Sequence, residues 1–466
     1  MSTPEGQTGK TGDDVSAHPR DRLPRVMSLW DASMLIVASV VGSGIFFTPS
    51  QVAVLLPSAG LILMAWIVGA LLSMAGALTN AELGAMFPHA GGDYVFLREG
   101  LHPAAGFLVG WVSFFAIFSG TIAALAVVFA ESMATAFDLD RTGILTLAVL
   151  LILACSLLNL RGTALGVGLN NLTSIAKIVA LVAFVILGPT LGEGSFAPWL
   201  GDAAATGATA AESVGAMDQW LRFGQALSPI LFSYLGWNAC VYVASEIKNP
   251  ARNLPRALFL GLGLCTGLYL LVNGVYLYAL GPEELASAGD AGQAAARALF
   301  GPLGGTLVFA FVLVSVLGTL NATVLVGPRI VYAMALDGLF IGRVGRVHPG
   351  FQTPGIAIGL QAVVSISLVL FLETFPNALN FTVFGIIVAT SADTIALFSL
   401  RRRQPDRRRP YRAWGYPWVP AMYLIVNLGI GAALLVGSPR ESFTMLGLLA
   451  VGMLAYLGFA RARTRG

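Results

Sequence analysis

Long apolar stretches separated by short polar segments repeat along the chain from near Leu29 to its C-terminal end. A segment needs about 20 predominantly apolar residues to cross a bilayer as a helix. The pattern therefore predicts about twelve membrane-spanning helices. Their approximate ranges are 28–56, 59–87, 103–135, 142–160, 165–189, 222–246, 255–281, 302–336, 353–373, 376–400, 415–437 and 441–460. The segment from about 190 to 221, rich in Gly, Ala and acidic residues, is predicted to be a loop.

The composition agrees with this pattern, because 56% of the 466 residues are hydrophobic and only 11% are charged. Soluble domains carry about 25% charged residues, so the protein is predicted to be an all-α polytopic membrane protein. Residues 1–25 are polar and lack the apolar segment of a signal peptide. We expect them to form a disordered cytoplasmic tail.

Basic residues lie mainly on alternate connections between the predicted spans. Twenty-two of the 27 lysines and arginines are on one side, including seven arginines at 401–412. Cytoplasmic loops carry such an excess, which places both termini in the cytoplasm and the protein in the cell membrane. Beside a span, the arginine-rich segment is expected to set topology and to touch anionic membrane lipids, not nucleic acid.

Two of the predicted spans are interrupted. The first contains Gly42-Ser43-Gly44, and the sixth contains Gly236 within SYLGWN. Corresponding interruptions in two halves of a chain indicate a transporter built from inverted repeats, whose binding site uses broken helices. The alternative is close helix packing, for which small residues are also used.

A broken helix offers unpaired backbone groups, which are tolerated at membrane depth only where they line a cavity or meet a ligand. The half-helix beginning at Ile45 would direct N–H groups and a positive dipole end at a carboxylate. The half-helix ending near Val40 and Val41 would present carbonyl groups, which suit an ammonium. One molecule that carries both groups on one carbon is an α-amino acid.

Four motifs carry a resemblance to a known family. They are GSGIF at 42–46, NAELGAMFPHAGGDYVFLREGL at 80–101, FSYLGWNACVYVASEIKNPARNLPRA at 232–257 and GTLNATVLVGPRIVYAMALDG at 318–338. In this order they resemble the amino acid–polyamine–organocation superfamily, and within it the L-type amino acid transporters. The resemblance implies a leucine-transporter-type fold of five-plus-five inverted repeats with discontinuous helices 1 and 6. It divides the chain into the tail, a ten-helix transport core at 26–400, a basic cytoplasmic loop at 401–414, and two C-terminal helices with a tail at 415–466.

The same resemblance implies a set of binding residues. The substrate carboxylate would bind the backbone amides of Ser43, Gly44 and Ile45. Its ammonium would meet the carbonyls of Val40, Phe232, Ser233 and Leu235. Phe232 corresponds to an aromatic gate over the substrate, and Asn238 to a polar residue in the second break; ordinary packing or lipid contact is the alternative for Phe232.

Lys177 is the only basic residue deep inside a predicted span, where charge is a sign of function. By resemblance it is a fixed cation that contacts the first and eighth helices in place of bound sodium, with a role in coupling. This implies sodium-independent transport. Burial also favours the neutral form of a lysine, which leaves a proton-coupled cycle open.

Acidic side chains occur at the edges of spans. We expect Glu82 to form a structural pair near the cytoplasmic end of its helix. Asp393 lies two helical turns before Arg401, so we expect it to reach an arginine at the interface, with proton carriage as the alternative.

These features predict a secondary-active transporter of small, neutral L-amino acids that works by alternating access, as a sodium-independent exchanger or facilitator. Neutral substrates are favoured because neither break contains an acidic side chain, and Leu235 would narrow the pocket. The alternatives are a proton-coupled symporter, an exchanger of polyamines or cationic amino acids, and a sensor that binds without transport.

No enzyme, cofactor or metal site is expected, because the four histidines lie in tails or loops and no catalytic motif is present. The connection between spans 3 and 4 has no cysteine, so no disulfide-linked heavy subunit is expected.

Overall fold

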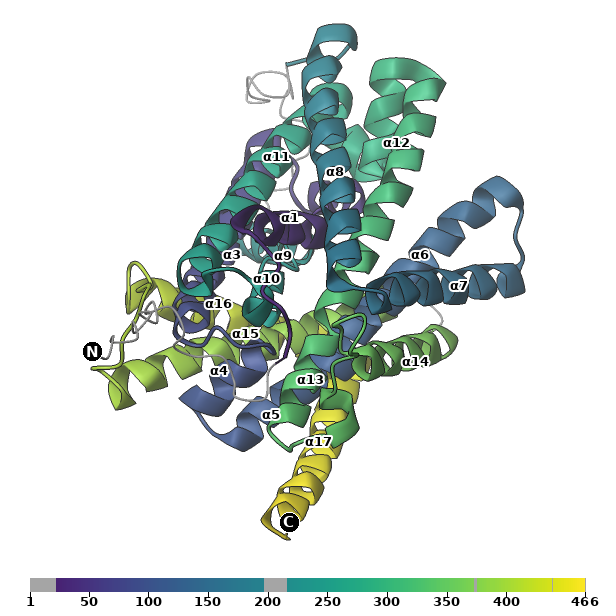
Figure 1. Cartoon of the computed structure of the whole chain (residues 1–466). Coiled ribbons are helices and arrows are strands. Elements are labelled where there is room, and N and C mark those ends of the chain that lie inside the picture. The colour runs from purple at the N-terminus through teal and green to yellow at the C-terminus, as the bar shows by residue number, and fades with distance from the viewer. Residues whose placement is uncertain (1–21, 197–215, 373–374, 438, 466) are drawn as a thin grey trace, which may run out of the picture.

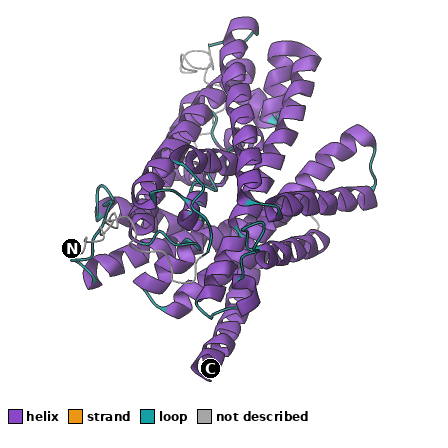
Figure 2. Cartoon of the chain, in the orientation of Figure 1, coloured by secondary structure: helices purple, strands orange, loops and turns teal. Residues whose placement is uncertain are grey.

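The computed structural model describes residues 22–196, 216–372, 375–437 and 439–465. The expected tail at 1–25 falls almost entirely outside these residues, as does most of the expected loop at 190–221. The described chain folds into helices joined by turns, with two isolated β-bridges as its extended pairings (Figure 2). The prediction of an all-α polytopic protein is confirmed.

The helices of the first half of the chain are α1 (Leu29–Val40), α2 (Gly44–Leu55), α3 (Ala59–Met86), α4 (Asp93–Gly100), α5 (Pro103–Val112), the π-helix η1 (Ser113–Phe118), α6 (Ser119–Phe137), α7 (Arg141–Leu160) and α8 (Thr163–Leu191). Those of the second half are α9 (Ala216–Ser233), α10 (Ala239–Tyr242), the 3-10 helix η3 (Ala244–Glu246), α11 (Pro250–Ser287), α12 (Ala291–Val326), α13 (Pro328–Leu336), the 3-10 helix η4 (Gly342–Gly345), α14 (Gly355–Leu372), α15 (Phe375–Arg403), α16 (Trp418–Gly437) and α17 (Pro439–Arg465).

Nine helices of the described chain are long and apolar enough to cross a membrane, and the bent pair α1 and α2 would make a tenth span. Two further predicted spans do not meet this criterion. The apolar part of α14 is shorter, at Gly355–Leu370, and the predicted span at 222–246 is divided between α9 and α10. The total of twelve spans, the inverted repeat and the division into domains therefore stay predictions.

Two helices extend beyond the predicted ends of their spans. The predicted boundaries at 281 and 302 coincide with kinks, where Gly281 and Gly301 adopt φ values of 67° and 70°. Helical residues continue past each kink, to Ser287 in α11 and back to Ala291 in α12. Since glycine adopts positive φ at little cost, each Gly-Pro step bends the helix at the end of its apolar part without ending it.

The first interruption lies at the centre of the helix bundle. α1 begins with a capping box, in which Ser28 and Asp31 satisfy each other's backbone amides, and it ends at Val40. After a short turn the chain resumes as α2, bent by 47° from α1. Figure 1 shows α1 beside α8, α11 and α12, and all three pack against it. The break is therefore enclosed by helices distant in sequence.

The second interruption faces the first. α9 ends at Ser233, and Gly236 turns the chain with φ of 95° before the single turn of α10. A Cβ atom at Gly236 would lie 2.7 Å from the Cβ of Ser39 in α1, and one at Gly44 would lie 2.8 Å from Oγ of Ser233. Thr48 and Ser233 also share a hydrogen bond of 2.6 Å. The missing side chains at the two glycines allow the breaks to touch.

Short backbone bridges hold the segment after α10 in place. Met27, just before α1, pairs with Ile247, and Ala90, just before α4, pairs with Val243. In the second bridge, the N–H of Gly91 donates to the carbonyl of Tyr242 at 3.0 Å. The loop after α3 is thus attached to the second half of the interrupted helix.

A buried ion pair joins three further segments. Arg329 of α13 is fully buried, and its guanidinium donates to both carboxylate oxygens of Glu246, at 2.8 and 3.1 Å. It also donates to Oγ1 of Thr163 at the start of α8. Such a pair fixes geometry, because removal of either partner would leave an uncompensated charge in the interior.

Glu82 forms the structural pair that the sequence suggests. Its carboxylate lies 2.7 Å from Arg401 and 3.1 Å from Arg409, and it accepts a hydrogen bond of 2.6 Å from the backbone N–H of Ala413. Glu82 is fully buried at the end of α3. This carboxylate therefore attaches the arginine-rich loop after α15 to the end of α3.

Candidate functional site

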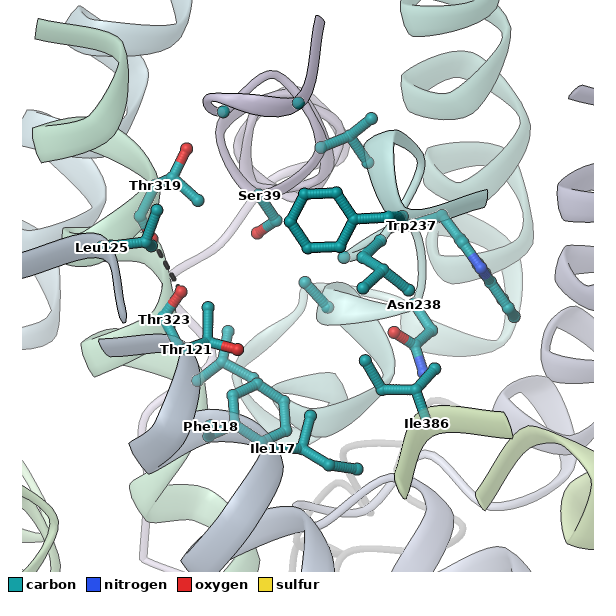
Figure 3. Close-up of a pocket in the computed structure, with 18 of the residues that line it drawn as sticks. Ser39, Ile117, Phe118, Thr121, Leu125, Trp237, Asn238, Thr319, Thr323 and Ile386 are labelled. Carbon is teal, nitrogen blue, oxygen red and sulfur yellow. Dashed lines mark hydrogen bonds between the residues drawn. The ribbon is translucent and has the colours of Figure 1, made fainter. Parts of the chain in front are cut away.

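A cavity of about 120 Å³ lies where the two interrupted helices meet. Figure 3 shows side chains from several helices converging on it, with Ser39 and Thr319 on one side and Ile117 and Ile386 on another. Its lining residues are Ser39, Val40, Gly42, Ser43, Gly44, Asp93, Ile117, Phe118, Thr121, Leu125, Phe232, Ser233, Leu235, Gly236, Trp237, Asn238, Ala239, Tyr242, Thr319, Thr323, Val326, Ile386, Ala389 and Thr390.

Most of the binding residues proposed from sequence come together in this wall. They are Val40, Ser43, Gly44, Phe232, Ser233, Leu235 and Asn238. Ile45 does not line the cavity, and its side chain is fully buried in the core; its backbone N–H belongs to the first turn of α2. Lys177 also lies outside the lining.

The start of α2 carries unsatisfied backbone donors. No residue in the described part of the chain accepts a hydrogen bond from the N–H groups of Ser43, Gly44 or Ile45. Ser43 provides no side-chain cap for this helix. The first N–H groups of a helix have no partner within it and carry the positive end of its dipole. This arrangement favours an anion at the cavity wall.

The ends of α1 and α9 present carbonyl groups on the other side of the contact. Tyr269 of α11 donates its hydroxyl to the carbonyls of Val40, at 2.8 Å, and Ser233, at 3.1 Å. Sequence analysis did not identify Tyr269, because nothing in its apolar helix distinguishes it from a packing tyrosine. Since each carbonyl oxygen has two lone pairs, both can accept a second donor.

Lys177 of α8 holds the turn between α1 and α2 from outside the cavity. Its side chain is fully buried, and Nζ donates to the carbonyls of Ala38, at 3.0 Å, and Val41, at 2.6 Å. A third hydrogen bond of 3.0 Å reaches Oγ1 of Thr319 in α12. The lysine therefore contacts the helices that correspond to the first and eighth spans, which are the contacts that the resemblance implies.

Further parts of the wall come from η1, α6, α12 and α15, and none of the residues that these helices contribute to the cavity was identified from the sequence. Ile117 and Phe118 belong to the π-helix η1. Ser119, the first residue of α6, donates its hydroxyl to the carbonyl of Phe114 in η1 at 2.7 Å. π-helical turns are rare and often occur at functional sites. The sequence SFFAIFSG has the composition of an ordinary apolar span, so it gave no sign of this distortion.

Asp93 adds an acidic group to the wall that the sequence also did not predict for the cavity. The first residue of α4, it accepts a hydrogen bond of 2.5 Å from the hydroxyl of Tyr242 in α10. Burial raises the pKa of the Asp93 carboxyl above its usual range, although the hydrogen bond from Tyr242 opposes this.

The prediction that Asp393 reaches an arginine at the interface is wrong. Asp393 does not reach Arg401, which pairs with Glu82. Asp393 is fully buried in α15, accepts a hydrogen bond of 3.1 Å from Asn80, and lies near the carboxyl group of Asp93. Asp393 and Arg401 are two helical turns apart along α15. The helices α3 and α4 pack against α15, and the carboxylate of Asp393 is buried between helices and does not extend to the interface.

Within the described ranges there is no group of three or more His, Cys, Asp and Glu side chains placed to hold a metal ion. The three cysteines, Cys155, Cys240 and Cys265, are buried as free thiols.

A small, mainly apolar cavity with unpaired backbone groups, placed between two broken helices in a bundle of membrane-spanning helices, is typical of a membrane carrier for a small solute. Comparison with known families agrees, because the amino acid permease family model matches residues 27–456. The chain belongs to this family, whose members are transporters and not enzymes.

The similarity to individual relatives covers most of the chain. The protein is 31% identical to the serine/threonine exchanger SteT of Bacillus subtilis, over 96% of this chain and 99% of that protein. It is 28% identical to the mouse large neutral amino acids transporter small subunit 2, over 94% of this chain and 79% of that protein. It is 26% identical to the mouse b(0,+)-type amino acid transporter 1, over 97% and 93% of the two chains.

Proposed function

We propose that this permease carries small, neutral L-amino acids across the cell membrane by alternating access, as a sodium-independent exchanger or facilitator. The observation that carries the proposal is the contact of two helix breaks at one cavity, with free N–H groups at the start of α2 and carbonyl groups at the ends of α1 and α9. Opposite partial charges thereby lie close together.

An amino acid backbone fits both sets of groups. Its carboxylate would accept hydrogen bonds from the N–H groups of Ser43, Gly44 and Ile45, which is the usual manner of anion binding at a helix start. Its ammonium would donate to carbonyls at Val40, Phe232, Ser233 and Leu235. Tyr269 supports this half of the site, because its hydroxyl keeps the two helix ends together.

The rest of the cavity favours a short, uncharged side chain. Pockets for drug-sized ligands usually enclose about 300 to 1,000 Å³, whereas this cavity encloses about 120 Å³. Leu235, Phe118 and Ile386 supply apolar surface, and Thr121 and Asn238 supply hydroxyl and amide groups. The relative named as a serine/threonine exchanger is consistent with small polar substrates. Phe232 is proposed to close over the bound molecule.

The position of Lys177 supports the proposed sodium independence. Its ammonium donates to carbonyls at the end of α1 and to Thr319, which are the kinds of oxygen that would coordinate a sodium ion. We therefore propose that the lysine takes the place of a coupling cation and holds α1 against α12.

The protein is further proposed to act without a covalent partner and with both termini in the cytoplasm. One relative is named a small subunit, but the three cysteines of this chain are buried. A disulfide-linked complex from native membranes on a non-reducing gel would contradict this part of the proposal.

The test begins with binding. The purified protein should gain thermal stability from small neutral amino acids among the twenty, and less or none from arginine, lysine or a polyamine. Counterflow of the radiolabelled best ligand into proteoliposomes without sodium then separates a carrier from a sensor. Binding without counterflow would identify a sensor, and stabilisation by none of the amino acids would contradict the proposal.

A further inference from the structure

Asp93 and Asp393 form a buried carboxyl pair beside the cavity. Their exposed fractions are 1% and 0%, and the two carboxyl groups lie close enough to interact, where α4 packs against α15. Tyr242 donates to Oδ2 of Asp93, and Asn80 donates to Oδ2 of Asp393. In both residues Oδ1 has no other partner among the described residues. The two orphan oxygens are buried polar atoms that lack a donor.

Two ionised carboxylates repel each other strongly in a buried site, so one member of a close pair takes up a proton. A protonated carboxyl donates where an ionised one accepts, and one proton therefore supplies a donor that the pair otherwise lacks. The groups around the pair do not supply a competing cation. Arg98, on the same helix as Asp93, is paired with Asp337, and the carboxylate of Glu82 in α3 holds Arg401 and Arg409.

The other titratable groups facing the pair are tyrosines. Tyr242 of α10 donates to Asp93, and Tyr423 of α16 lies near both carboxyls. Neither tyrosine brings a positive charge. No lysine or arginine forms an ion pair with Asp93 or Asp393 in the described part of the chain. A proton is therefore the simplest positive charge that the pair can hold.

We propose that Asp93 and Asp393 bind one proton between them and that its release opens the part of the cavity wall formed by Asp93 at the start of α4, here called the floor, so that transport by this permease responds to pH. This inference rests on the proposed function, because it gives that carrier a proton site. Release converts one carboxyl and one carboxylate into two carboxylates, and the proton passes to water on the side of the basic loops.

The position of the pair explains how its charge acts on the cavity. Asp93 begins α4 and lines the cavity, whereas Asp393 lies on α15, which packs against α4. The loop before α4 is attached to α10 by the hydrogen bond from Gly91 to Tyr242. Repulsion between two buried carboxylates would push α4 away from α15 and would move this floor. The protonated pair stabilises the closed floor, and the ionised pair favours the open one.

The test measures counterflow of the best-binding amino acid in proteoliposomes, with the same pH on both sides, from pH 5 to pH 8. We expect the rate of the unaltered protein to fall with rising pH, approaching tenfold for each unit above the pKa of the pair, because the protonated fraction falls by that factor. In Asp393→Asn, an amide donates permanently to Asp93, and the rate should lose its dependence on pH. Asp393→Glu should keep a dependence that is displaced along the pH axis.

Asp290→Asn is the matched control. Asp290 is a carboxylate that caps α12 outside the cavity lining, and asparagine caps helices equally well. This variant should keep the unaltered pH profile. A pH-independent rate in the unaltered protein, or an unaltered profile in Asp393→Asn, would overturn the inference.

Two further readouts keep the inference separate from the proposed function. A pH indicator trapped in the vesicles should report proton movement when substrate is added, and Asp393→Asn should abolish it. Counterflow that requires sodium would contradict the sodium independence proposed above, whereas sodium-free counterflow at a rate independent of pH would reject the proton site alone. Absence of counterflow at every pH would reject the proposed function itself.

Discussion

Gly44 offers the sharpest test of the binding site, because its missing side chain lets the two helix breaks touch. In Gly44→Ala the new Cβ would lie 2.8 Å from Oγ of Ser233 and 2.9 Å from its Cα. Backbone must move to relieve the second contact, so the start of α2 and the end of α9 would separate. Overpacking of this kind costs about 1 to 3 kcal/mol, which is roughly a five- to 150-fold loss of affinity if it falls on the bound state.

The assay measures the melting temperature of purified protein against the concentration of the best-binding amino acid. The concentration that gives half of the maximal rise in melting temperature reports the affinity. Gly263→Ala is the matched control, since a Cβ there has no atom within 4 Å and Gly263 lies in the middle of α11. That variant should bind normally and gain up to about 1 kcal/mol in stability from its better helix propensity. Unchanged affinity in Gly44→Ala, or an equal loss in Gly263→Ala, would refute the argument.

Other changes test the supports of the site. Tyr269→Phe removes the hydrogen bonds from α11 to the carbonyls of both helix breaks. It should cost about 1 to 3 kcal/mol of stability, with a weaker response to substrate in the same melting assay. Lys177→Met deletes three hydrogen bonds and should abolish sodium-free counterflow while detergent-purified protein remains monodisperse; wild-type rates would contradict its coupling role. Arg329→Met should destabilise the protein by about 3 to 5 kcal/mol, because Glu246 is left charged and buried, and adding Glu246→Gln should recover part of the melting temperature. Burial raises the pKa of Asp93 to about 6, above its unfolded value of about 4. This contribution to stability is complete below about pH 4 and is lost as pH rises through the raised pKa. The melting temperature should therefore fall between about pH 4 and pH 6, and less so in Asp93→Asn.

The interrupted helix and the buried lysine could be predicted because each has a local cause. Gly42 and Gly44 weaken a helix wherever it packs, and unpaired backbone in a membrane must face a cavity. A charge as far inside an apolar span as Lys177 requires polar partners whatever the fold is. These inferences needed only the residues on one segment.

The partners of Asp393 and the role of Tyr269 could not be predicted, because both depend on which helices pack together. Along its own helix Asp393 precedes Arg401 by two turns, and sequence distance alone favoured that pair. Packing of α3 and α4 against α15 brought Asn80 and Asp93 closer. The distortion at η1 was hidden for a related reason, since a single hydroxyl at Ser119 supports it within an otherwise uniform apolar segment.

The attachment of the basic loop to Glu82 determines where this chain can be shortened. α16 and α17 lie outside the cavity and contribute none of its lining, so they invite deletion in a search for the minimal carrier. A chain that ended at residue 400 would lose Arg401, Arg409 and the N–H of Ala413, and it would leave a bare carboxylate in the core. A chain that ended after residue 414 would keep all three donors. The last two helices can therefore be studied by truncation only if the loop before them is counted as part of the core.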